Sequence, residues 1–120
     1  MSEILVVTSR PEEMSDFTRT LSKDGRKVTL AGSGMKALEI LRSTPPDMVV
    51  ADERLPDMSG LDLVRRILLI NAMINTAVVS GLPSDEFHEV SEGLGVLVQL
   101  PMQPGSAGAE EILSKLAQFS

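Results

Sequence analysis

Residues 49–60 read VVADERLPDMSG, and this stretch decides the fold class. Three small or apolar residues, Val49 to Ala51, lead directly into Asp52, and a polar loop with Pro56 and Gly60 follows. After the loop comes LDLVRRILLI, a segment with the apolar period of a helix. A run that reads as a buried strand thus ends in a carboxylate, although burying an unpaired charge is costly. Asp52 is therefore either a turn residue that faces water or the reason that the turn exists.

The composition indicates one globular domain over residues 1–120, with 42% hydrophobic residues and no cysteine for disulfides or thiolate metal sites. The formal net charge of −6 argues against a nucleic-acid surface, which needs clustered lysines and arginines. The start, MSEILVV, lacks the features of a signal peptide, and no apolar run approaches the roughly 20 residues of a membrane helix. We therefore expect a cytoplasmic protein that binds neither nucleic acid nor membranes.

Short apolar runs alternate with segments of helical period along the chain. We predict strands at 4–7, 27–31, 48–52, 76–80 and 96–100, and helices at 11–25, 35–43, 61–71, 84–93 and 109–119. The helix residues expected to face inward are Met14, Phe17, Leu21, Leu38, Leu41, Val64, Ile67, Leu68, Ile112, Leu113, Leu116 and Phe119. The strands show no polar alternation, which is typical of a parallel sheet buried on both faces. Five such βα units predict a doubly wound α/β fold.

Functional sites of doubly wound sheets lie beyond the carboxyl ends of the strands. In this chain those ends are Thr8-Ser9, Asp52, Ser80-Gly81 and Leu100-Pro101. Asp52 therefore lies where a site would form, which favours a site residue over an ordinary turn residue.

With its five βα units, the whole chain resembles the receiver domains of two-component response regulators. VVADERLPDMSG is similar to their third-strand signature, an aspartate followed by a loop with proline and glycine. The resemblance implies a flavodoxin-like, five-stranded parallel sheet of order 2-1-3-4-5 with five helices. It also implies that Asp52 accepts a phosphoryl group from a histidine kinase beside Mg²⁺, and that Ser80 contacts the phosphoryl oxygen. A cis peptide bond is implied before Pro101.

Several positions depart from the family pattern. Thr8 and Ser9 stand where the family carries an acidic pair, Leu100 where it carries a lysine, and Leu97 where it carries a switching aromatic residue. Because Mg²⁺ binds through carboxylates, Asp52 alone should hold it poorly. We therefore expect Mg²⁺ to bind weakly or not at all, and no other cofactor to bind tightly.

Asp52 should still need a positive partner. Arg10 follows the first predicted strand, and Arg54 lies two residues beyond Asp52. Either guanidinium could form a bidentate pair with the carboxylate and substitute for the missing cations.

Small polar residues before the predicted helices are typical of caps. Ser9 and Glu12 fit a capping box for the helix at 11–25. Asp57 and Ser59 are expected to shape the loop before the helix at 61–71 and to cap its first turn.

Gly32-Ser-Gly34, followed by Ala37, matches the dinucleotide-binding pattern G-x-G-x-x-A, and Asp52 lies 20 residues beyond Gly32. The pattern follows the second predicted strand, however, and leaves the strand at 4–7 without a role. A small nucleotide-binding protein is kept as a remote alternative.

The preferred function is a non-enzymatic, receiver-like signalling module of a two-component phosphorelay, with Asp52 as the phospho-acceptor and output by protein–protein contact. By resemblance, a histidine kinase or another signalling protein would bind through residues 84–119. The alternative is a phosphorylation-independent pseudo-receiver that acts as a protein-interaction module.

Overall fold

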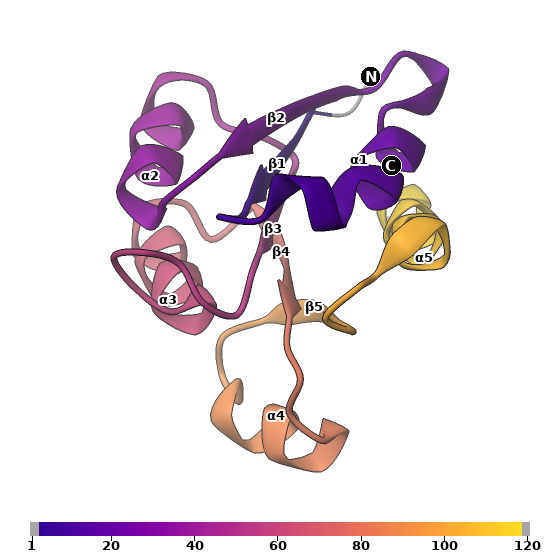
Figure 1. The fold of residues 1–120 in the computed structure, drawn as a ribbon. Helices are drawn as coiled ribbons and strands as arrows, with labels where there is room; N and C mark the ends of the chain where they lie inside the picture. The colour runs from indigo at the N-terminus through magenta and orange to yellow at the C-terminus, as the bar shows by residue number, and fades with distance from the viewer. Residues whose placement is uncertain (1–2, 119–120) are drawn as a thin grey trace.

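The computed structural model describes residues 3–118, which form one five-stranded parallel sheet of order β2-β1-β3-β4-β5 (Figure 1). The strands are β1 (Glu3–Val7), β2 (Lys27–Ala31), β3 (Met48–Ala51), β4 (Asn75–Val79) and β5 (Val96–Leu100). The helices are α1 (Ser15–Leu21), α2 (Gly34–Ser43), α3 (Gly60–Ile70), α4 (Ser84–Val90) and α5 (Gly105–Ala117), with 3-10 turns at Pro11–Met14 and Lys23–Gly25. The predicted doubly wound sheet and its strand order are confirmed.

Helices cover both faces of the sheet, α1 and α5 on one side and α2 and α3 on the other (Figure 1). Successive residues of β1 point into opposite layers. Ile4 and Val6 enter the core beneath α1 and α5, whereas Leu5 and Val7 enter the core beneath α2 and α3. All four side chains are buried. This two-sided burial explains why the strands read as apolar runs without alternation.

Most helix positions predicted to face inward are buried, and one is not. Met14, Phe17, Leu21, Leu38, Leu41, Val64, Ile67 and Ile112 are buried, and Leu113 and Leu116 pack partly buried against the core. The prediction for Leu68 is wrong, since this side chain is 38% exposed. It lies at the margin of α3, beside a recess of about 60 Å³ lined also by Leu94 and Gly95. Phe119 lies outside the described residues.

The loop after β3 caps two helices. Ser59 caps α3 as predicted, because its hydroxyl oxygen accepts a hydrogen bond from the Asp62 N–H at 3.1 Å. Asp57 instead caps α2, where its carboxylate accepts hydrogen bonds from the Met35 and Gly34 N–H groups, each at 2.9 Å. These bonds lower the pKa of the Asp57 carboxyl below its ordinary value. The role predicted for Asp57 at α3 is therefore wrong, because the loop folds back against α2.

The same contact accounts for the glycine pattern at residues 32–34. A dinucleotide site would need free N–H groups at this helix start, but Gly34 donates its N–H to Asp57. Ser33 occupies the α2 N-cap and accepts from the Lys36 N–H at 3.1 Å. The pattern thus serves the start of α2 and gives no support to nucleotide binding.

The predicted capping box at Ser9 does not form. Pro11 begins a 3-10 turn whose N-cap position is Arg10, one residue later than the box requires. Ser9 is exposed, and the Thr8 hydroxyl accepts the Arg10 N–H at 3.0 Å instead.

Gly60 sets the approach of α3 to the end of β3. Its N–H donates to the Glu53 carbonyl oxygen at 3.0 Å. A Cβ atom at this position would collide with the backbone carbonyl oxygen of Asp52. The first turn of α3 therefore rests directly on the backbone at Asp52, and only glycine permits that contact.

Replacing Gly60 with alanine should destabilise the fold, although alanine is favoured in helices by about 1 kcal/mol. The collision with backbone should outweigh that gain, with a net loss of about 1–3 kcal/mol in the free energy of unfolding. Gly32→Ala is the matched control, because a Cβ there meets nothing within 4 Å. Urea unfolding of both variants measures the difference, and equal midpoints would contradict this account of Gly60.

Candidate functional site

Asp52 lies one residue beyond β3, at the carboxyl edge of the sheet, and is only 2% exposed. Its N–H donates to the Val7 carbonyl oxygen at 2.9 Å, which extends the pairing of β1 and β3. Thr8 and Ser80 follow β1 and β4 and are also buried. The topology therefore gathers three polar side chains at one edge of an otherwise apolar core.

Four donors surround the Asp52 carboxylate. Oδ2 accepts from the Thr8 hydroxyl at 2.8 Å and from Arg10 Nε at 2.8 Å. Oδ1 accepts from Arg10 Nη2 at 3.2 Å and from the Glu53 N–H at 2.8 Å. An ionised carboxylate offers about four lone-pair sites. The acceptor capacity of Asp52 is therefore fully used within the protein.

Arg10 is the cation that reaches Asp52. Besides the bidentate pair, its guanidinium contacts Glu13 Oε2 at 3.4 Å and the Met102 carbonyl oxygen at 2.5 Å. It thus joins the loop after β1 to the loop after β5. Hydrogen bonding to Asp52 raises the pKa of Arg10 above its ordinary value, so the side chain remains charged. Arg54 is exposed and forms no ion pair among residues 3–118.

Ser80 lies at the same edge, but its hydroxyl is bonded to Glu53 rather than to Asp52. Its hydroxyl donates to Glu53 Oε1 at 3.1 Å, and the Gly81 N–H donates to the same oxygen at 3.0 Å. Glu53 was not predicted to belong to the site, because the sequence pattern pointed to Asp52 as its carboxylate. The alternation of side chains along an extended segment was the available signal, because it points neighbouring residues in opposite directions.

The remaining sequence candidates are not among the groups that bond the Asp52 carboxylate. Leu100 is fully buried in the core beneath α1 and α5, and Leu97 packs partly buried against the same core. Ser9 is exposed. The Leu100–Pro101 peptide bond is trans, so the predicted cis bond is wrong. Trans is the lower-energy isomer before proline by about 0.5–1 kcal/mol, and the buried Leu100 side chain is accommodated with it.

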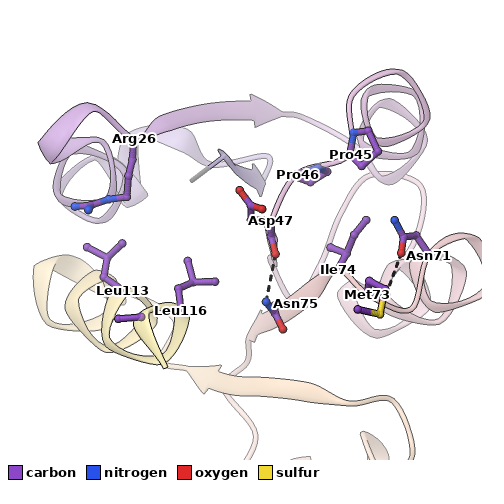
Figure 2. Close-up of a pocket in the computed structure, with 11 residues that line it drawn as sticks. Arg26, Pro45, Pro46, Asp47, Asn71, Met73, Ile74, Asn75, Leu113 and Leu116 are labelled. Atoms are coloured by element: carbon purple, nitrogen blue, oxygen red, sulfur yellow. Dashed lines mark hydrogen bonds between the residues drawn. The ribbon is translucent and has the colours of Figure 1, made fainter. Parts of the chain in front are cut away.

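A pocket of about 520 Å³ lies at the other end of the strands from Asp52 (Figure 2). Its lining includes Asp47 and Asn75, next to the amino ends of β3 and β4, and Leu116 of α5. The Asp47 carboxylate accepts the Glu3 N–H at 2.8 Å, and the Arg26 Nε donates to the Leu21 carbonyl oxygen at 2.9 Å. These charged groups already have partners within the fold, so the pocket adds nothing to the Asp52 site.

Residues 4–96 match the family model of the response regulator receiver domain. The chain belongs to this family. Transcriptional regulatory protein KdpE of Mycobacterium tuberculosis is 36% identical over 119 residues, which cover 97% of this chain and 50% of that protein. Sporulation initiation phosphotransferase F of Bacillus subtilis is 25% identical over 95 residues, or 79% of this chain and 77% of that protein. The chain thus spans only half the length of KdpE.

The solved structures agree on the fold. Chemotaxis response regulator CheY4 of Vibrio cholerae superimposes with a TM-score of 0.84 at 18% identity, covering 97% of this chain and 98% of that one. Receiver domains are signalling modules rather than typical enzymes, and this one is a receiver module of two-component signalling. Among residues 3–118, no helix has the length and apolarity to cross a bilayer.

The resident Mg²⁺ that the family implies does not suit this receiver's donor set. Mg²⁺ requires near-octahedral oxygen ligands, usually with one or two carboxylates. Both Asp52 oxygens already accept two hydrogen bonds each, and a guanidinium lies against them. The Glu53 carboxylate is bonded to Ser80 and Gly81 instead. A cation at Asp52 would have to displace Arg10.

Arg10→Met should destabilise the domain, because it leaves the buried Asp52 carboxylate without its charged donors. We expect a loss of about 1.5–3 kcal/mol in the free energy of unfolding. Arg19→Met removes an equal charge from an exposed ion pair with Asp16, and should change stability by less than about 1 kcal/mol. Chemical denaturation of the two variants and the wild type measures the contrast. Similar losses in both variants would show that the Arg10–Asp52 pair contributes no more to the free energy of unfolding than an exposed ion pair.

Proposed function

We propose that this receiver domain signals mainly in its unphosphorylated form, by protein–protein contact, and that Asp52 is a slow phospho-acceptor. The observation that supports the proposal is the Asp52 carboxylate, whose oxygens are occupied by Arg10, Thr8 and the Glu53 N–H. The ion pair gives the site a neutralised charge without phosphate or metal.

The chemistry of phosphorylation explains why Asp52 should react slowly. A carboxylate oxygen must attack the phosphorus atom while the bond from phosphorus to the leaving group breaks. Because each Asp52 oxygen already accepts two hydrogen bonds, at least one donor has to leave first. Charge that develops on the phosphoryl oxygens also needs a cation. Leu100 offers none, and we propose that Mg²⁺ binds only weakly beside the Arg10 guanidinium.

Phosphorylation should also be weakly coupled to a change of conformation. A phosphoryl group shifts a two-state equilibrium only by its differential interaction with the two states. A nearly complete inversion needs about 5.5 kcal/mol, whereas one net hydrogen bond to Ser80 contributes about 0.5–1.5 kcal/mol. The Ser80 hydroxyl is already bonded to Glu53, which reduces the available gain further.

We propose residues 84–119 as the partner surface, with a histidine kinase or another signalling protein as the partner. The support is the composition of this face. Val90 and Met102 are 45% and 37% exposed, and α4 carries the acidic residues Asp85 and Glu86. Exposed apolar side chains near acidic residues are compatible with a protein-binding surface.

Treatment with a small acyl phosphate and Mg²⁺ tests the Asp52 proposal. We expect intact mass spectrometry to show most of the wild-type protein unmodified, because Arg10 competes with both the metal ion and the phosphoryl donor. Asp52→Asn provides the blank, and a receiver with a complete acidic pair and lysine, treated in parallel, shows that the reagent is active. Stoichiometric addition of one phosphoryl group, absent from Asp52→Asn, would make an ordinary phospho-switch the better account.

Hydrogen exchange with a histidine kinase phosphotransfer domain tests the partner surface. Protection should concentrate in residues 84–119 and should persist in Asp52→Asn, because the proposed contact does not require phosphate. A Val90→Glu variant should reduce the protection, whereas Leu30→Glu, which alters a 50% exposed residue on β2, should not. Protection confined to other segments would contradict this assignment.

A further inference from the structure

The side chain of Glu53 crosses from the end of β3 to the loop after β4. One of its oxygens, Oε1, accepts both the Ser80 hydroxyl at 3.1 Å and the Gly81 N–H at 3.0 Å. The Ser80 oxygen in turn accepts the Leu82 N–H at 3.2 Å. Donors from two successive residues thus meet at a single carboxylate oxygen, and the Leu82 N–H supports the Ser80 hydroxyl.

Two carbonyl groups of the loop at residues 80–82 are bonded to Gln99 of β5. Gln99 Nε2 donates to the Ser80 carbonyl oxygen at 3.3 Å and to the Leu82 carbonyl oxygen at 2.8 Å. With the Ser80 and Leu82 carbonyls bonded to Gln99 of β5, the Ser80 hydroxyl and the Gly81 N–H face Glu53. A hydroxyl and the next backbone N–H, both directed at one point, are donors that suit an anion. The anion that these two donors hold is the protein's own carboxylate.

The surrounding charges would permit an external anion in the same place. Asp52 is balanced by the bidentate Arg10 pair. Glu53, by contrast, forms no ion pair in the described part of the chain and is held by neutral donors. Removal of the Glu53 carboxylate would therefore leave unfilled donors and one fewer negative charge.

We propose that Glu53 is a built-in competitor for a tetrahedral oxyanion, such as phosphate, at the Ser80–Gly81 donors. While the carboxylate occupies them, the loop at residues 80–82 is held as a bound anion would hold it, whatever the state of Asp52. The inference rests on the proposed function, because it supplies a reason why this receiver does not need phosphate. It assigns the hydroxyl and N–H of this loop to Glu53 rather than to an incoming phosphoryl group.

Titration with inorganic phosphate, followed by backbone amide NMR, tests the competition. Glu53→Ala should show saturable shifts of the Gly81 and Leu82 amides at concentrations at least about tenfold lower than the wild type, the scale of one hydrogen bond. Glu92→Ala is the matched control, because it removes an equal charge from an exposed turn after α4. Equal responses of Glu53→Ala and Glu92→Ala, or the absence of saturation in Glu53→Ala, would overturn the proposal.

Amide exchange without phosphate gives a second, independent readout. The Gly81 amide should exchange about tenfold faster in Glu53→Ala than in the wild type, and phosphate should restore its protection. Glu53→Gln, which keeps an acceptor oxygen without the charge, should show an intermediate effect and serves if the alanine variant is unfolded. Unchanged exchange in both variants would refute the role of Glu53.

Failure here is distinguishable from failure of the proposed function. Inorganic phosphate has no activated leaving group and does not phosphorylate Asp52, so the NMR titration reports only on the loop donors. Suppose that acyl phosphate leaves Asp52 unmodified and that Glu53→Ala does not bind inorganic phosphate. The competitor role of Glu53 is then refuted, and the proposed function stands. If Asp52 is readily phosphorylated while Glu53→Ala gains phosphate affinity, the proposed function fails and the competitor stands.

Discussion

The buried charge of Asp52 is the constraint on which this edge of the sheet depends. A carboxylate that is 2% exposed would be costly without compensation, and the fold supplies four donors, two of them from one guanidinium. Because Arg10 also bonds the Met102 carbonyl oxygen, the same ion pair joins the loops after β1 and β5. Gly60 then brings the first turn of α3 onto the backbone of Asp52. The loops after β1 and β5 and the first turn of α3 are thus positioned around one charge at the end of β3.

Asp52 and Glu53 are neighbours in the chain but serve different partners. Asp52 turns toward the loop after β1 and meets a cation, whereas Glu53 turns toward the loop after β4 and meets an N–H and a hydroxyl. The Glu53 N–H also donates to Asp52 Oδ1, so the two carboxylates are coupled through one peptide group. Three hydrogen bonds and one peptide group thus connect Arg10 to Ser80.

The sequence predicted the sheet well because its signals are local. Apolar runs identify strands buried on both faces, and Asp52 at the end of one of them indicates the position of the site. The errors concern contacts between segments far apart in the chain. Asp57 caps α2, 22 and 23 residues away, rather than the adjacent helix. Leu68 has the right helical period but lacks a neighbour that covers it, and Glu53 acquires its role only when β4 lies beside β3.

The departures from the receiver pattern form one consistent electrostatic set. An acidic pair together with Asp52 would place three carboxylates at one edge, and such a cluster requires a metal ion and a lysine. With neutral Thr8 and Ser9 in place of the pair, Asp52 is the one carboxylate left of those three, and a single guanidinium balances it. A lysine at position 100 would then add a charge at a fully buried position, while the Asp52 carboxylate has no free acceptor to pair with it. A leucine buried in the core avoids that cost, so Thr8, Ser9 and Leu100 all suit a site whose carboxylate is balanced by Arg10.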